Sequence, residues 1–431
     1  MIMDHKNSTP EKRRRAAALF LHALMLLLIT ALLLSACGNN AASTEAPEET
    51  PSETRTEEST AQRTEETEEP SELPESRTEE RTEAPTEESS EESTEEPTET
   101  VLETTKTVPP ETMPKRDPDA VIDLSTTLYT YDKMCTDLQY LSENYPERMT
   151  LETAGVTADG RPLYAVYFGN RNASRSFFIC AATHGREYMT AQLVMKQLEY
   201  YCAHYTDGSY NGVPFSTLFQ DTLFVIVPMV NPDGVTVSQL GEDGIRREDL
   251  KNNLRSIYAS DLANGFTSYD YPTYLTRWKA NLLGVDLNRN FSPGWETVRE
   301  RSVPSADFFK GNEPGDQAEA QALMQLVNGM TSPRAVISYH SYGDLVYWQY
   351  GQPEPLWTAN QNLAQHISNL TGHYLAGYSN EAGFTNWCII ERKIPAVVVE
   401  TGTVPTPLPL DQFAPLFEKH RYMWAMLASL Y

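Results

Sequence analysis

The stretch Phe177-Phe-Ile-Cys-Ala-Ala-Thr-His-Gly-Arg-Glu187 combines a signal for the fold with a signal for chemistry. Its first six residues form an apolar run typical of a buried β-strand. His184 and Glu187 follow three positions apart, so both side chains can reach one ion from a loop that enters a helix. A third candidate ligand, His340, ends another apolar run at 335–339. Two histidines and one glutamate are a ligand set of catalytic zinc that leaves a position open for water, so we predict a zinc hydrolase.

Short apolar runs alternate with amphipathic stretches through the rest of residues 118–431. We predict further strands at 163–168, 222–227, 335–339 and 396–400, and helices at 130–145, 190–205, 318–328, 356–370 and 412–431. Strands that read as continuous apolar runs between helices indicate an α/β fold whose sheet is covered on both faces.

Three polar side chains fall at the ends of these strands, because His184 follows one, His340 ends a second and Glu400 ends a third. Ligands of open α/β sheets bind beyond the carboxyl ends of the strands, so the three can meet in one crevice. Glu400 closes a strongly apolar run, and desolvation raises the pKa of a carboxyl group toward neutrality. It is therefore the candidate general base. Two alternatives stay open: His340 as an ordinary core histidine and Glu400 as a salt-bridged or helix-capping residue.

The segment Gly284-Val-Asp-Leu-Asn-Arg-Asn-Phe291 is the most specific motif of the chain. Arg289 offers a planar guanidinium fork and Asn288 an amide, and together these can grip a carboxylate. The alternative is a structural turn with an arginine–aspartate pair.

These motifs resemble the zinc metallocarboxypeptidases of the carboxypeptidase A type, the M14 family, and the resemblance covers roughly residues 125–430. The motifs occur in family order: His184-Gly-Arg-Glu187, Asn231-Pro-Asp-Gly234, Asp286-Leu-Asn-Arg-Asn290, His340-Ser-Tyr342, Tyr378 and Glu400. The resemblance implies a mixed, largely parallel central sheet and one zinc ion per chain.

The resemblance also implies roles for individual residues. It makes His184, Glu187 and His340 the zinc ligands and Glu400 the general acid/base. The substrate's terminal carboxylate would be held by Asn288, Arg289 and Tyr378, the last on a mobile loop, and Arg186 would be a further substrate contact.

Two parts of the site depart from the family pattern or are less defined. Where the family has an arginine that polarises the scissile carbonyl, this chain has Lys279, with Arg277 as the fallback. The pocket for the last substrate residue should include Thr385, with Gly383 and His373 nearby. A polar insertion at about 241–272 is expected to line or cover the cleft.

The N-terminus has the pattern of an export signal. A basic segment, Lys12–Arg15, precedes an apolar run and the sequence Leu34-Ser-Ala-Cys37, which resembles a bacterial lipobox. We predict a signal peptide at 1–36, lipidation of Cys37, and an extracytoplasmic protein that is lipid-anchored to the bacterial cell membrane. An uncleaved membrane anchor and plain secretion are the alternatives.

Residues 37–117 consist mainly of Thr, Glu, Pro and Ser and carry most of the chain's net charge of −26. Such a segment buries too little apolar surface to offset its ordering entropy, so we predict a disordered acidic tether before a catalytic domain at 118–431. The acidic balance disfavours nucleic-acid binding. We expect a monomer.

These inferences favour a membrane-tethered zinc carboxypeptidase that removes C-terminal residues from peptides. The runner-up is a peptidase that cuts the γ-D-glutamyl–diaminopimelate bond of cell-wall peptides, which the Trp278-Lys-Ala-Asn281 context also resembles. A non-catalytic receptor for wall peptides is a third class, although a receptor needs no general base.

Overall fold

The computed structural model describes residues 120–379 and 382–431. The predicted signal peptide, Cys37 and the acidic tether lie outside these residues and stay predictions. Within the described ranges, no helix is both long enough and apolar enough to cross a membrane.

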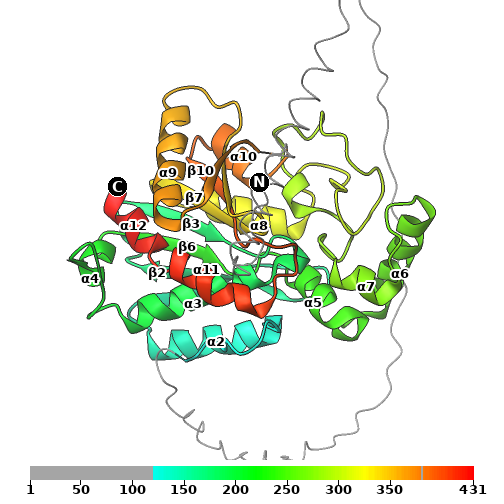
Figure 1. Ribbon diagram of the computed structural model, residues 1–431, viewed down its shortest axis with the longest axis horizontal. Coiled ribbons are helices and arrows are strands. Elements are labelled where there is room, and N and C mark those ends of the chain that lie inside the picture. The colour runs from blue at the N-terminus through cyan, green and yellow to red at the C-terminus, as the bar shows by residue number, and fades with distance from the viewer. Residues whose placement is uncertain (1–119, 380–381) are drawn as a thin grey trace, which may run out of the picture. The chain divides into compact units, whose positions relative to one another are not determined.

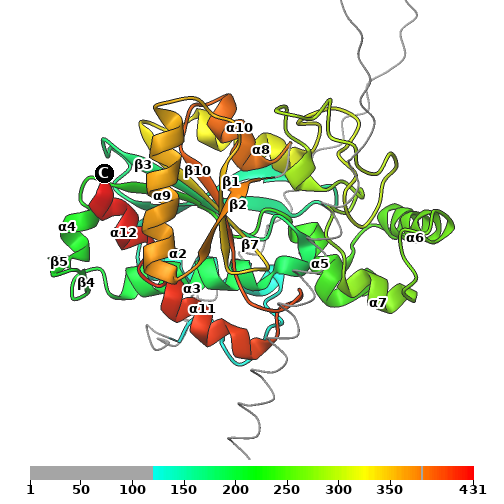
Figure 2. The same ribbon diagram turned by 45° about the horizontal axis from the view of Figure 1, so that its top comes forward.

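One mixed sheet forms the centre of the described chain (Figures 1 and 2). Its four middle strands run parallel, and the next strand on each side is antiparallel to them. The outermost strand is antiparallel to its neighbour on one side and parallel to its neighbour on the other. In spatial order the strands are β1 (Met149–Val156), β2 (Pro162–Gly169), β6 (Leu223–Val227), β3 (Ser176–Cys180), β7 (Pro333–His340), β10 (Ala396–Glu400), β8 (Leu345–Gln349) and β9 (Tyr374–Tyr378). The predicted mixed, largely parallel α/β sheet is confirmed.

Alternate residues of the middle strands enter two separate cores, as the two-residue period of a strand requires. Phe177 and Ile179 of β3 face one core, whereas Phe178 and Cys180 face the other. Helices that cover the first face are α2 (Tyr131–Asn144), α3 (Met189–Ala203), α4 (Phe215–Phe219), α9 (Leu356–Thr371), α11 (Phe413–His420) and α12 (Met423–Leu430). The second face is covered by α8 (Ala318–Asn328) and α10 (Phe384–Ile390).

The predicted insertion at 241–272 folds around a third apolar cluster. Leu250, Leu254 and Ile257 lie on one side of α6 (Glu248–Ala263) and pack in the same cluster as Trp278. The neighbouring elements are α5 (Pro232–Leu240), η2 (Gly241–Gly244) and α7 (Tyr271–Thr276).

The remaining elements lie elsewhere in the described chain. They are η1 (Gly185–Glu187), η3 (Leu287–Arg289), η4 (Leu410–Gln412) and a small hairpin of β4 (Ser209–Tyr210) and β5 (Val213–Pro214).

The predicted single helix at 412–431 is wrong, because the chain breaks it into α11 and α12. The carbonyl of His420 accepts a hydrogen bond from Nε2 of Gln197 in α3 at 2.6 Å. A contact to another helix thus takes a carbonyl that a continuous helix would have used internally.

Candidate metal centre and active site

The three predicted strand-end residues lie together because their strands are neighbours. β3, β7 and β10 are adjacent and parallel, and Glu400 pairs directly with His340 in the register of β10 and β7. His184 lies just past the end of β3, at the start of η1. Parallel register therefore brings His184 and His340, which are 156 positions apart in the chain, to the same end of the sheet.

The loop that carries His184 and Glu187 is fixed by the Asn231-Pro-Asp-Gly234 motif. The amide of Asn231 donates to the carbonyls of Thr183 and Ala280, at 3.1 and 3.0 Å. A Cβ on Gly185 would lie 2.3 Å from the carbonyl oxygen of Gly234, so only glycine allows this approach. The motif thus positions the metal-binding loop rather than contacting the metal.

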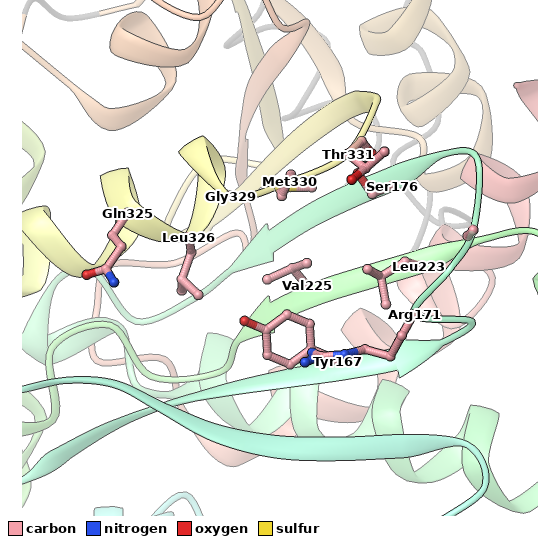
Figure 3. Close-up of a pocket in the computed structure, with 11 residues that line it drawn as sticks. Tyr167, Arg171, Ser176, Leu223, Val225, Gln325, Leu326, Gly329, Met330 and Thr331 are labelled. Atoms are coloured by element: carbon pink, nitrogen blue, oxygen red, sulfur yellow. Dashed lines mark hydrogen bonds between the residues drawn. The ribbon is translucent and has the colours of Figure 1, made fainter.

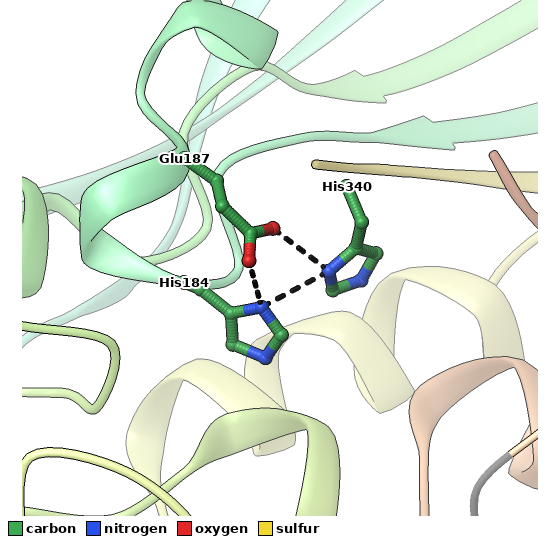
Figure 4. A group of neighbouring side chains, drawn as sticks. All are labelled: His184, Glu187 and His340. Carbon is green, nitrogen blue, oxygen red and sulfur yellow. Dashed lines mark hydrogen bonds and ion pairs between the residues drawn. The ribbon is translucent and has the colours of Figure 1, made fainter. Parts of the chain in front are cut away.

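The candidate ligands converge on one point (Figure 4). Nδ1 of His184 lies 2.7 Å from Oε1 of Glu187, and Nδ1 of His340 lies 3.1 Å from Oε2 of the same carboxylate. The two Nδ1 atoms are 3.1 Å apart, and one donor atom from each of the three residues falls within 4.8 Å of the others. Burial alone would raise the pKa of Glu187, but the charges and hydrogen bonds of both histidines outweigh it and hold this pKa low.

This arrangement fits a zinc ion. Two imidazole nitrogens and a buried, ionised carboxylate face a common centre. These are ligands that catalytic zinc uses in proteins. His340 also has an Nε2 atom that lacks a hydrogen-bond partner in the described structure.

Asp286 contacts His184 on the side of the imidazole away from Glu187. The motif alone gave this residue no role. Its Oδ1 atom lies 3.2 Å from Nε2 of His184, and its Oδ2 atom accepts from Nζ of Lys279 at 2.8 Å. Burial would raise the pKa of this carboxyl group, but Lys279 and His184 keep it well below the ordinary value. The sequence feature that could have indicated this role is the position of Asp286 in the motif, two residues before Asn288.

Glu400 has the environment that the apolar run predicted. Burial, with help from the charge of Glu187, raises its pKa to about 7 even though His340 and Lys279 oppose the shift. Its Oε2 atom is buried and has no hydrogen-bond partner among the described residues. A carboxyl group that titrates near neutrality can both accept and donate a proton at physiological pH.

Lys279 is buried close to this centre, but its ammonium group already has partners. Besides its bond to Asp286, Nζ lies 4.6 Å from the centre of the Phe308 ring. The oxyanion role of Lys279 stays a prediction. The fallback residue Arg277 stacks on Tyr269 of the insertion at 4.8 Å.

Arg186 faces a small hollow on the side of the insertion. Its Nη1 atom donates to the carbonyl of Arg277 at 3.2 Å, and its Nε atom has no partner in the described structure. The hollow has a volume of about 70 Å³ and is also lined by Phe266, Thr267 and Tyr269. The insertion therefore lines this hollow beside Arg186, and the substrate contact of Arg186 stays a prediction.

Arg289 and Asn288, the predicted carboxylate-binding pair, contact other groups of the protein. Nε of Arg289 pairs with Oε1 of Glu300 at 3.1 Å, and its Nη1 atom donates to the carbonyl of Asn288 at 2.9 Å. The side-chain oxygen of Asn288 accepts from the backbone N–H of Phe384 at 3.2 Å, and Thr385 follows, buried in the first turn of α10. The pair involves a glutamate eleven residues away, which the motif alone did not indicate.

Tyr378 and His373 were both expected near the substrate. Tyr378 ends β9 as an exposed side chain whose ring lies 5.3 Å from that of Tyr350, and its substrate-binding role stays a prediction. The suggestion that His373 lines the pocket beside Thr385 finds no support, because His373 is buried against His420, with their Nε2 atoms 3.1 Å apart.

A larger hollow of about 460 Å³ lies at the opposite edge of the sheet (Figure 3). It is bounded by Ser176 and Leu223, the first residues of β3 and β6, and by the stacked pair of Tyr167 and Arg171. The metal ligands follow the carboxyl ends of the strands, so this hollow is separate from the candidate active site.

Comparison with known proteins agrees with this geometry. A γ-D-glutamyl-L-diamino acid endopeptidase 1 of Lysinibacillus sphaericus is 29% identical over 307 residues, which are 70% of this chain and 72% of that protein. Mast cell carboxypeptidase A of Homo sapiens is 22% identical over 54% of this chain and 50% of its own length, so the chain spans about half of that relative. The crystal structure of thrombin activatable fibrinolysis inhibitor shares the fold, with a TM-score of 0.54 and 18% identity over 72% of this chain and 77% of that one.

The family model described as zinc carboxypeptidase, Peptidase_M14, matches residues 134–393, which contain all three candidate metal ligands. The family is that of zinc-dependent peptidases. Its match, the ligand geometry and the fold lead to one conclusion: this chain belongs to the zinc carboxypeptidase family.

Proposed function

We propose that this protein is a membrane-tethered zinc peptidase that hydrolyses the γ-D-glutamyl–diamino acid bond of cell-wall peptides. The observation that carries the hydrolase part is the meeting of His184, Glu187 and His340 with Glu400 at adjacent strand ends. Ordinary peptides with a free C-terminal carboxylate are the second candidate substrate, which the sequence alone favoured.

The residues divide the reaction between them. His184, Glu187 and His340 would hold the zinc ion, which supplies polarisation of the scissile carbonyl and a lowered pKa for bound water. Glu400 would accept a proton from the attacking water and deliver it to the leaving nitrogen, since its pKa of about 7 suits both steps. Arg289 and Asn288 orient the leaving residue through its carboxylate.

Two observations favour wall peptides over ordinary ones. Identity to the Lysinibacillus endopeptidase is 29%, against 22% to the human carboxypeptidase, and it extends over more of the chain. In addition, Glu300 places a negative charge against the carboxylate-binding Arg289, which disfavours a leaving residue whose only charge is a carboxylate. The predicted lipid anchor would keep the enzyme near the wall.

A comparison of two substrates tests the proposal. The zinc-loaded protein should release diaminopimelate from L-Ala-γ-D-Glu-diaminopimelate, and a chelator should abolish the release. The matched control is a peptide of the same length with an ordinary α-peptide bond before its last residue. Faster cleavage of the control would reject the wall-peptide proposal in favour of a general carboxypeptidase.

A further inference from the structure

Glu300 lies beside the candidate carboxylate grip, on a loop that the family motifs do not include. Its Oε1 atom is 3.1 Å from Nε of Arg289, and the two side chains are 25% and 4% exposed. Arg289 is therefore almost fully buried with one acidic partner, while that partner still reaches solvent. A ligand can approach Glu300 without unfolding the loop.

The loop that carries Glu300 is anchored to the metal centre through the backbone. The N–H of Arg301 donates to the carbonyl of Phe308 at 3.1 Å, and the N–H of Phe308 donates to Oδ2 of Asp286 at 3.2 Å. Asp286 in turn contacts His184. The backbone next to Glu300 is thus connected to the candidate metal ligand His184 by a short series of hydrogen bonds.

The cations around Glu300 already have acidic partners. Arg289 is paired with Glu300, Lys279 with Asp286, and Arg301 with both Asp307 and Asp261. A ligand group that brings only a carboxylate would be attracted by Arg289 and repelled by Glu300. A leaving residue that carries both a carboxylate and an ammonium group satisfies both residues at once.

We propose that Glu300 is the specificity residue that recognises the distal ammonium group of the leaving diamino acid, while Arg289 binds a carboxylate of the same residue. The inference rests on the proposed function, and it assigns a residue to the diamino-acid preference. Glu300 contacts substrate and takes no part in the hydrolytic step.

The test compares two leaving residues that differ in a single group. Diaminopimelate and 2-aminopimelate have the same length and the same distal carboxylate, but only the first has the distal amine. Wild-type protein should cleave γ-D-Glu-diaminopimelate with a kcat/KM about 10-fold above that for γ-D-Glu-2-aminopimelate, as for one charge-assisted contact. Glu300→Gln should reduce this ratio to about 1, and Glu300→Asp should partly restore it.

The ratio is measured within each variant, so a change in folded fraction or zinc content cancels. The control Glu296→Gln, which removes an exposed charge from the same loop, should leave the ratio unchanged. An unchanged ratio in Glu300→Gln would overturn the proposal. An equal rise of kcat/KM for both substrates would also overturn it, because Glu300 would then only compete with the substrate carboxylate for Arg289.

Failure of the proposed function has a different signature. If wild type cleaves neither γ-D-glutamyl substrate but cleaves ordinary peptides, the same comparison is made with peptides that end in lysine or norleucine. A preference for lysine that Glu300→Gln removes would retain the role of Glu300 while rejecting the wall-peptide substrate. No preference in wild type would reject both.

Discussion

Oδ1 of Asp286 lies 3.2 Å from Nε2 of His184, so the carboxylate fixes the imidazole with Nδ1 toward the metal position. Removing the charge of such a partner typically weakens metal binding 10- to 100-fold, so we expect Asp286→Asn to lower zinc affinity by about that factor. Competition with a chromogenic chelator measures it. Asp261→Asn, at a buried carboxylate in α6, is the matched control and should leave zinc affinity intact.

Glu400→Gln should separate chemistry from metal binding. The amide keeps the shape of the side chain but cannot accept a proton from the attacking water, so kcat should fall by about 10³-fold or more. Zinc content, measured by atomic absorption, should stay at one ion per chain. Glu187→Gln is the contrasting variant and should lose zinc; loss of zinc in Glu400→Gln would refute the acid/base assignment.

Arg289→Lys should weaken recognition of the leaving carboxylate. Lysine keeps the charge but lacks the planar fork, so kcat/KM should fall about 10- to 100-fold, mainly through KM. The comparison substrate is the same peptide with its terminal carboxylate converted to an amide, for which wild type and variant should differ little. An equal loss on both substrates would indicate a structural role for Arg289.

The buried pair of His373 and His420 should make the fold sensitive to acid. Burial lowers the pKa of His373 from 6.5 to about 4, and burial also holds the pKa of His420 well below its ordinary value. The folded state therefore stays neutral while the unfolded chain takes up protons, so stability is lost as the pH falls from 6.5 toward 4. Relative to His373→Gln, wild type should lose up to about 3 kcal/mol over this window, measured by urea unfolding. A constant difference would contradict the assignment.

Glu319 should produce a pH dependence of opposite sign. Burial, helped by the charge of Asp233, raises its pKa from 4.5 to about 7, and its Oε1 atom has no partner in the described structure. The folded state keeps this proton longer than the unfolded chain, so stability falls as the pH rises from 4.5 to 7. Glu319→Gln should therefore unfold at higher urea concentration than wild type above pH 7, by up to about 3 kcal/mol. Equal stability of the two proteins at pH 8 would count against it.

Sequence periodicity located the central elements well. The bounds of α8 and β10 agree with their predicted ranges, and the ends of β3, β6 and β7 lie within two residues of theirs. These strands are buried on both faces, so each reads as a continuous apolar run. The edge strands β1 and β9 were not predicted, because their side chains are largely half-buried or exposed and the apolar signal is weak.

By itself the sequence determined which residues can bind zinc and which can act as a base, since spacing and residue type restrict that chemistry. It also placed His184, His340 and Glu400 at strand ends. Only the tertiary structure decided what supports them. The contacts of Asp286 with His184, of Glu300 with Arg289 and of His420 with Gln197 join segments whose approach depends on how strands align and helices pack. Local sequence patterns indicate which side chains are buried against the sheet. The residue that each side chain contacts on a distant segment depends on the whole fold.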